Sequence, residues 1–377
     1  MRRLFKTIQK LYRGMVLRLS VRGHSESKNL RRGELATESK IIGLDKLATS
    51  LSTVTVLFIH YHHRGLISAG YLKVISSAIE CGYRVVLVST KLSDLWCEKL
   101  VSMSVAVIQR GNSGYDFGSL QAARKILMEH GLLGSKRYVV INSSMLNIAS
   151  HGFHGDPFLD ALVDPPDEAD LVGITSSYED RTFHIQTFFF SMSQRMFEAK
   201  TFGRFLGDYL RGLNSTKEAS RTYAIKNGEL KLTRFALSQG LLARSLLFHH
   251  GLPDVAAFEE MKVLSRKMVD LLEDEDGLVC ANNIKSLIND FSSEWIPKAG
   301  LQYNPSQACW ALLMSRGFLF LKREVLELSE TRSIHAPSVC ALLMPLLSLL
   351  TIDIPEWSDL NQLPEIIYAP PLRSSKR

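Results

Sequence analysis

Cysteine is scarce in this sequence of 377 residues, and its positions form no familiar pattern. The five cysteines are widely spaced, at Cys81, Cys97, Cys280, Cys309 and Cys340. No Cys-x-x-Cys pair occurs, so neither a disulfide framework nor a zinc finger is indicated, and a reducing compartment is the simpler interpretation. Long apolar runs are missing too. The Leu-rich run Val339–Ile352 has 14 residues and contains Pro345. A membrane-spanning helix needs about 20, so we expect a buried helix there.

The fingerprints of the common nucleotide-binding folds are also absent. Neither GxGxxG nor a Walker A sequence occurs, which removes the signature support for an NAD-dependent oxidoreductase or a P-loop NTPase. The only Asp-x-Asp, Asp274-Glu275-Asp276, lies in an acidic run that we interpret as solvent-exposed. The hydrophobic fraction of 46% and the charged fraction of 22% are globular values and exclude a mainly disordered chain.

Basic charge is concentrated near the start of the sequence. Residues 1–46 contain 12 Lys and Arg against 4 Asp and Glu, a net charge of +8, while the whole chain carries +7. The remainder is therefore close to neutral. A nucleic-acid partner calls for basic charge spread over the fold, so we predict none.

Residues 1–24 are predicted to form a basic amphipathic helix. Apolar residues recur at helical spacing from Leu4 to Leu19, and most of the seven Lys and Arg lie off that stripe. Such a helix suits an anionic membrane surface, where each basic residue adds at most about 1 kcal/mol. Docking on the same chain and an organellar transit peptide are the alternatives. The polar residues 25–50 look like a linker.

From about residue 53 to 194, strand and helix patterns alternate, which predicts an α/β domain with a mostly parallel sheet and crossover helices. From about 195 the pattern turns helical, and the domain is expected to extend over residues 51–250. The expected strands are Val54–His60, Arg84–Thr90, Val105–Arg110, Arg137–Ser143, Leu171–Ser176 and His184–Met192. The expected helices are Leu66–Cys81, Lys91–Ser102, Ser119–Leu133, Arg195–Leu213, Leu230–Phe248 and, further on, Ala256–Glu273. Residues 251–377 are predicted to be a mainly helical part packed on this domain.

Polar residues follow three expected strands at their carboxyl ends, the edge where parallel sheets bind ligands. They are His60-Tyr61, Asn112 to Asp116, and Asn142 to Ser144. The glycine-rich segment Gly111–Gly118 lies between a strand and a helix, where backbone can approach a phosphate. A tight turn is the simpler alternative for that segment.

Three further groups are candidates on residue type. His184 and Gln186 fall on one face of an expected strand, which places them at a substrate site, although a lone His is more often structural. Glu229 opens an expected helix, where spacing alone favours an acid that interacts with the helix dipole. The cluster His60, His62 and His63 is a weak metal candidate, since no Cys or carboxylate lies nearby in the sequence.

Taken together, these segments resemble the rhamnan synthesis protein F family, a group of bacterial polysaccharide glycosyltransferases. The matching segments are His60-Tyr61, Asn112 to Gly118, Asn142 to Ser144, Asp170 to Thr175, His184 to Thr187, Glu229 to Thr233, and Asn304-Pro305 with Gly317 to Glu324. They extend over about residues 53–326. The resemblance implies a GT-A-like nucleotide-sugar domain and transfer of a sugar, typically rhamnose from dTDP-rhamnose, onto a growing glycan.

The resemblance also implies roles for single residues. It implies donor-binding roles for His60, Tyr61, Asn112, Gly114, Tyr115, Asn142, Ser143 and Ser144. It implies substrate-binding roles for His184, Gln186, Lys322 and Arg323. Glu229, 85 residues after Ser144, becomes the first candidate for the catalytic base, with Asp116 second. A base that accepts the proton of the acceptor hydroxyl contributes about 10²–10⁴ in rate.

One position departs from the family pattern. The family has Asn-Asp-Ser where this chain has Asn142-Ser143-Ser144, so the carboxylate that would hold Mg²⁺ or Mn²⁺ is missing. Neutral oxygens are poor sole ligands for Mg²⁺, so we assign no metal ligand and expect donor binding to depend little on metal. The alternative is that Mg²⁺ or Mn²⁺ binds with Asp116 as its one carboxylate ligand. Backbone N–H groups near Gly114–Gly118, or Lys322 and Arg323, would then meet the diphosphate.

The sequence thus predicts a glycosyltransferase that builds a cell-surface polysaccharide or lipopolysaccharide. Its expected partners are a nucleotide-sugar donor, a glycan or lipid-linked acceptor, and an anionic membrane surface bound by residues 1–24. The expected location is cytoplasmic, peripherally at the inner face of the membrane. The alternative is a non-catalytic GT-A-like scaffold or carbohydrate-binding subunit of a polysaccharide assembly complex.

Deleting residues 1–24 should release the protein from anionic liposomes, because the deletion removes seven positive charges and the apolar stripe together. Co-sedimentation with anionic liposomes measures this, with neutral liposomes as the control and circular dichroism as a check on folding. A truncated chain that sediments as before would contradict the prediction.

Overall fold

The computed structural model describes residues 39–48, 52–62, 65–149, 152–177, 182–216, 220–247, 304–308 and 310–323. It also describes single positions at 260, 263, 267, 343, 346, 347, 350–352 and 359. All of these residues belong to one compact unit that begins at Ser39. The predicted helix over 1–24, residues 25–38 of the predicted linker and most of 251–377 lie outside the described residues. None of the described helices is long and apolar enough to cross a membrane.

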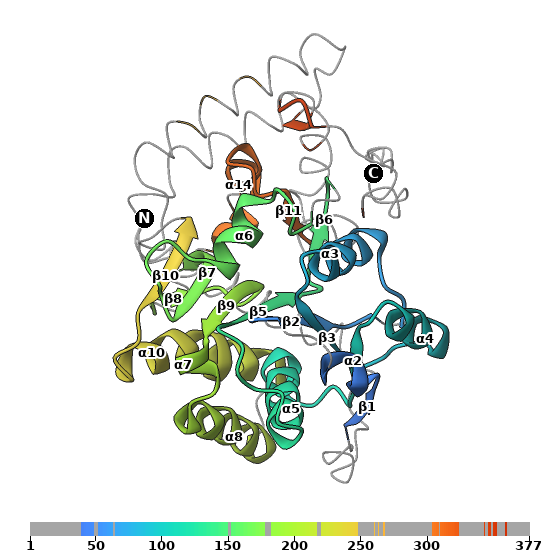
Figure 1. The fold of residues 1–377 in the computed structure, drawn as a ribbon. Coiled ribbons are helices and arrows are strands. Elements are labelled where there is room, and N and C mark those ends of the chain that lie inside the picture. Colours follow the sequence, from blue (N-terminus) through green and yellow to red (C-terminus); the bar gives the residue numbers. More distant parts are fainter. Residues whose placement is uncertain are drawn as a thin grey trace, which may run out of the picture. The chain divides into compact units, whose positions relative to one another are not determined.

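Within the described part of the chain, nine strands form one mixed, mostly parallel sheet (Figure 1). Along the sheet the order is β1-β4-β3-β2-β5-β9-β7-β10, and β8 pairs with β7 outside this order. The strands are β1 (Lys40–Ile42), β2 (Val54–His60), β3 (Arg84–Ser89), β4 (Ala106–Gln109), β5 (Arg137–Asn142), β7 (Leu171–Ser177), β8 (His184–Ile185), β9 (Phe189–Ser193) and β10 (Ala243–Leu247). β4, β3, β2 and β5 are mutually parallel, as are β7 and β10, whereas β9 runs antiparallel to both neighbours and β1 antiparallel to β4.

The central strands are mainly apolar because helices cover both faces of the sheet. All seven residues of β2 are buried, the pattern expected for a parallel strand inside an α/β fold. Its side chains alternate between two cores: Val56 and Phe58 point to one, and Leu57 and Ile59 to the other. The structure is therefore an α/β fold, as predicted.

Two sets of helices form the outer layers (Figure 1). One face packs against α3 (Ala69–Glu80), α4 (Asp94–Ser102), α6 (Pro157–Val163) and α14 (Trp310–Ser315). The other packs against α2 (Leu44–Ala48), α5 (Tyr115–Glu129), α7 (Gln194–Phe197), α8 (Lys200–Ser215) and α10 (Leu230–Ser238). The short helix α13 (Pro305–Ala308) precedes α14. The described residues near 304–323 thus pack on the same sheet as the first half of the chain.

A second, two-stranded sheet lies beside the first. β6 (Met145–Asn147) pairs antiparallel with β11 (Phe320–Lys322), with Lys322 opposite Met145. This pairing brings a segment from late in the chain to the carboxyl end of β5, which β6 directly follows. The sequence patterns did not predict either strand, since each has only three residues.

Three sequence predictions need correction. Residues 40–48, assigned to the polar linker 25–50, contain β1 and α2, and β1 forms the edge of the large sheet. The helix predicted over Leu230–Phe248 ends at Ser238, because Gly240 adopts φ +67° and the chain turns into β10. The strand predicted over His184–Met192 is two strands, β8 and β9. Of the predicted helix over Val339–Ile352, Leu343, Leu346 and Leu347 are described and buried, whereas the described residues 350–352 lie in or directly after a turn and are not buried.

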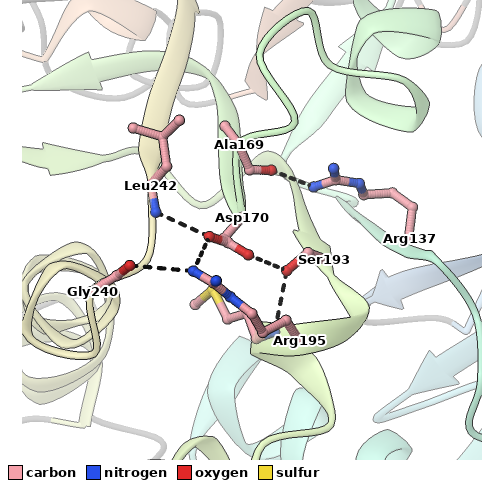
Figure 2. Close-up of polar contacts among 8 residues, drawn as sticks. Arg137, Ala169, Asp170, Ser193, Arg195, Gly240 and Leu242 are labelled. Carbon is pink, nitrogen blue, oxygen red and sulfur yellow. Dashed lines mark hydrogen bonds and ion pairs between the residues drawn. The ribbon is translucent and has the colours of Figure 1, made fainter.

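A single carboxylate joins three strands at the edge of the sheet opposite the carboxyl ends of β5, β7 and β10 (Figure 2). Asp170, directly before β7, accepts hydrogen bonds from the Ser193 hydroxyl at the end of β9 (2.6 Å) and from the backbone N–H of Leu242 before β10 (3.0 Å). Arg195 in α7 adds an ion pair of 2.9 Å to the same carboxylate. We interpret this part of the family-like segment 170–175 as structural.

Replacing Asp170 with Ala should lower the free energy of unfolding by about 2–3 kcal/mol, because it removes the buried acceptor of one partly buried N–H, one hydroxyl and the Arg195 ion pair. Urea denaturation measures this. The control is Asp208→Ala on α8, whose carboxylate is 65% exposed in an ion pair with Arg211. A change within about 0.5 kcal/mol is expected there, and an equally small change at Asp170 would refute the assigned role.

Candidate functional site

The candidate site lies where the direction of the chain across the sheet reverses. From β2 the chain moves outward through β3 and β4, and it then returns to β5 on the other side of β2. Open α/β sheets bind ligands beyond the carboxyl ends of the strands at such a point. Because Ile59 pairs with Asn142, the polar residues after both strands are neighbours.

Asn142 is fixed on all sides at the end of β5. Its side-chain Nδ2 donates to the carboxylate of Asp116, and its Oδ1 accepts from the backbone N–H of Ser144 (2.7 Å). Its backbone N–H donates to Phe188 O (2.9 Å), and its carbonyl accepts from the Tyr71 hydroxyl. Asn142 therefore ties the end of β5 to α5, the helix that carries Asp116.

A strained loop sets the start of α5. Gly114 has φ +79°, and Tyr115 adopts φ +48°, a conformation uncommon for a residue with a side chain. A Cβ atom on Gly118 would lie 2.1 Å from Ser113 O, so only glycine fits there. The predicted glycine-rich segment is thus a tight turn followed by a helix, and its purpose in the fold is to bring Asp116 against Asn142.

The carboxyl of Asp116 sits in an unusual electrostatic environment. Burial, and after it the charge of Glu229, raises the pKa of Asp116 to about 7. Arg110, the hydrogen bond from Asn142 and the charge of Lys322 act in the opposite direction. Asp116 therefore exchanges its proton near neutral pH, which is the range where a general acid or base is useful.

Glu229 reaches the same place from a different helix. It ends a π-helical turn, Ala224–Glu229, which follows α9 (Ser220–Tyr223) and leads directly into α10. This corrects the prediction that Glu229 opens a helix, since the helical backbone begins earlier. A Cβ atom on Gly228 would lie 2.4 Å from the Phe117 ring, so glycine permits the close contact with α5. Thr187 N–H donates to Glu229 Oε1 (3.2 Å).

Two cationic residues lie at the end of β11: Lys322 is its last residue, and Arg323 follows it. Lys322 pairs with Met145, and the backbone N–H of Arg323 donates to Ser144 O (2.8 Å). The charge of Lys322 lowers the pKa of Asp116, and the charge of Arg323 lowers the pKa of His60. The antiparallel pairing of β6 with β11 therefore carries both predicted substrate-binding cations to the end of β5.

Of the two predicted residues at the end of β2, His60 is buried and Tyr61 is exposed. His60 is buried, with Nδ1 2.9 Å from Ser89 Oγ and Nε2 2.9 Å from Leu66 O. Burial is the main cause that lowers the pKa of His60 to about 4, so the ring is neutral at physiological pH. This places His60 in the protein interior rather than in the donor-binding role predicted for it. Tyr61 is 60% exposed, and Ser143 Oγ accepts from its backbone N–H (3.0 Å).

Gln186 and His184 also differ from their predicted positions at a substrate site, since both are buried. Gln186 Oε1 accepts from the Thr175 hydroxyl (2.7 Å), and its Nε2 donates to Asn304 Oδ1 (2.8 Å). Gln186 thus links β7 to the start of α13. His184 Nδ1 lies 2.9 Å from Thr182 O. The alternation along the strand predicted that His184 and Gln186 share a face, and both side chains are buried inside the protein.

Other predicted residues lie around this arrangement without a new role. Asn112 is exposed, and Gly114 is buried with its carbonyl bonded to the Tyr209 hydroxyl (3.1 Å). His62 Nδ1 accepts from Leu66 N–H (3.3 Å), and His63 lies outside the described residues. Among the residues that the structure describes, no group of three His, Cys, Asp or Glu is placed to hold a metal ion.

Several residues of the site escaped sequence reasoning. Arg110 donates to Ser119 Oγ (3.0 Å) and to Ser113 O, which braces the loop before Asp116. Asp359 accepts from the backbone N–H groups of Gly70 (2.8 Å) and Asn147 (2.9 Å) and so joins α3 to β6. The sequence holds no signal for a contact across so many residues.

The comparisons with known proteins add no assignment. No protein-family model matches the chain, and no curated protein matches it. Interpretation of the site therefore depends on its geometry and on the motifs quoted above.

The raised pKa of Asp116 predicts a pH dependence of stability. Between the ordinary pKa near 4 and about 7, the folded state binds more protons than the unfolded state, so stability falls as pH rises through this window. Asp116→Asn, which mimics the protonated acid, should flatten that part of the curve of unfolding free energy against pH. Urea denaturation across pH 4 to 8 measures it, with Asp208→Asn as the exposed control. Parallel curves for the variant and the native chain would contradict the prediction.

Proposed function

We propose that this protein is a glycosyltransferase of the GT-A type that moves a sugar from a nucleoside diphosphate donor onto a glycan hydroxyl. The observation that carries the proposal is the convergence of Asn142, Glu229 and Lys322 on Asp116. These residues come from three separate helices or strands and meet at the carboxyl end of β5 beside the topological switch point. Sugar transfer needs an acceptor for a proton and positive charge for the leaving diphosphate, and both kinds of group are present here.

Glu229 is the proposed base. The Thr187 N–H holds one of its carboxylate oxygens, which orients the side chain. Asp116 bonds to Asn142 and has a pKa of about 7, so it is protonated part of the time at neutral pH. The two acids thus have different environments, a situation that separates the roles of paired carboxyl groups in catalysis. Glu229 takes the proton of the acceptor hydroxyl as the sugar is transferred, while Asp116 positions or protonates a substrate oxygen.

The mostly parallel sheet supports the GT-A part of the proposal, since its strand ends gather the site residues on one edge. The sequence resemblance supports the proposed sugar, and the basic segment 1–24 supports the proposed membrane location. On these grounds the proposed donor is dTDP-rhamnose, the acceptor is a growing glycan or lipid-linked glycan, and the protein works at the cytoplasmic face of a membrane.

A non-catalytic carbohydrate-binding subunit is the second candidate function. The favouring observation is that Ser143, where the family has Asp, uses its hydroxyl to hold Tyr61, and Asn142 is bonded on both side-chain atoms. Such a subunit would bind a nucleotide sugar or glycan without turnover, so binding and turnover must be measured together.

Glu229→Gln should lower turnover by about 10²–10⁴ while leaving donor affinity nearly unchanged, because the amide cannot accept a proton but keeps the shape of the side chain. A panel of nucleotide sugars assayed with membrane extract as acceptor gives turnover, and isothermal titration gives affinity. Glu129→Gln, at the far end of α5, is the matched control. Turnover retained in Glu229→Gln would rule out the base, and binding without turnover in the native chain would favour the subunit.

A further inference from the structure

The end of β5 offers a divalent cation no carboxylate, and the side-chain oxygens of Asn142 and Ser143 already take part in hydrogen bonds. Asn142 Oδ1 accepts from Ser144 N–H at 2.7 Å, and its Nδ2 donates to Asp116. Ser143 Oγ accepts from Tyr61 N–H at 3.0 Å and lies 3.4 Å from Tyr61 O. The polar side-chain atoms of these two residues are therefore engaged inside the protein. Mg²⁺ and Mn²⁺ require several oxygen ligands, and carboxylates are the favoured ones from proteins.

The nearest carboxylates do not replace the missing one. Asp116 already accepts a hydrogen bond from Asn142. Glu229 Oε1 is bonded to the Thr187 N–H. The donor set at this strand end therefore does not fit the divalent ion that the family resemblance implies, and the negative charge of a diphosphate must be met by other groups.

Two cationic residues lie next to the segment that follows β5. Phe320 and Leu321 are buried, so the β6–β11 pairing is anchored in the core and fixes the backbone of Lys322 and Arg323 beside Ser144. Burial is the main influence on the pKa of His60, Tyr71 and Asp359, and the charge of Arg323 acts on all three: it adds to the lowering at His60 and opposes the rise at Tyr71 and Asp359. The charge of Lys322 acts on Asp116.

We infer that Lys322 and Arg323 take the place of a divalent cation in holding the donor's diphosphate, so that donor binding proceeds without metal. The inference rests on the proposed function. Arg323 supplies a planar fork that matches two phosphate oxygens, and Lys322 supplies a compact charge. Each charge-assisted contact to phosphate is roughly twice as strong as a neutral hydrogen bond, which compensates for the lost metal–oxygen bonds.

The test is isothermal titration of the full chain with thymidine, uridine, guanosine and cytidine diphosphates, each in excess EDTA and in millimolar MgCl₂ or MnCl₂. For the nucleotide that binds, the affinities with and without metal should agree within about threefold. Lys322→Gln and Arg323→Gln should each weaken binding by about tenfold and reduce its dependence on salt. Lys125→Gln, an exposed cation near the far end of α5, should leave it unchanged. Melting temperatures identify any variant that fails to fold.

The possible outcomes are distinct. Binding that appears only with Mg²⁺ or Mn²⁺ overturns the inference and leaves the glycosyltransferase proposal standing. Metal-free binding that neither Gln variant weakens overturns the roles of Lys322 and Arg323. Failure of every nucleoside diphosphate to bind in either condition overturns the proposed function as well. Ser143→Asp restores the family carboxylate. Donor binding that becomes metal-dependent in this variant supports the inference. Donor binding that stays metal-independent contradicts the argument that the carboxylate missing at position 143 is the reason why the native chain needs no metal.

Discussion

The parallel pairing of β2 with β5 is the interaction on which the candidate site depends. Its register places Ile59 opposite Asn142, and from Asn142 hydrogen bonds lead to α5 through Asp116 and to α3 through Tyr71. β6 continues from the same strand end and pairs with β11, so the cations from late in the chain are located by the same register. A shift of one residue between β2 and β5 would turn each apolar side chain to the wrong face and separate these groups.

Much of the sheet was predictable because buried parallel strands are continuous apolar runs. The expected strand Val54–His60 agrees with β2, and Arg84–Thr90 and Arg137–Ser143 each differ from β3 and β5 by one residue. β10 was not predictable in this way: after α10, the residues Ala243–Leu247 continue a helix-compatible composition, and only their pairing with β7 makes them a strand. Short strands such as β11 carry too few residues to show a period.

The sequence indicated which residues come together at the candidate site better than it indicated what each side chain does there. Asp116, Asn142, Glu229 and Lys322 were selected separately from the sequence, and the fold brings them together. His60 and Gln186 were selected on the same grounds, yet their polar atoms bond within the protein. A polar residue at a strand end can face either way, and the choice depends on distant partners such as Asn304 that a local pattern does not reveal.

The π-helical turn Ala224–Glu229 acts as a one-residue insertion in an otherwise continuous helix. Each residue advances an α-helix by about 100°, so the extra residue turns the α9 side relative to the α10 side by about that angle. Tyr223 can thus bond to Tyr209 on α8 while Leu232 and Ala236 remain in the core, and Gly228 still faces Phe117. Losing one residue from this turn would restore a regular helix, but it would leave one of these three contacts facing away. The irregular turn therefore lets the α9 side contact α8 while the α10 side packs in the core, and it still places Glu229 next to α5.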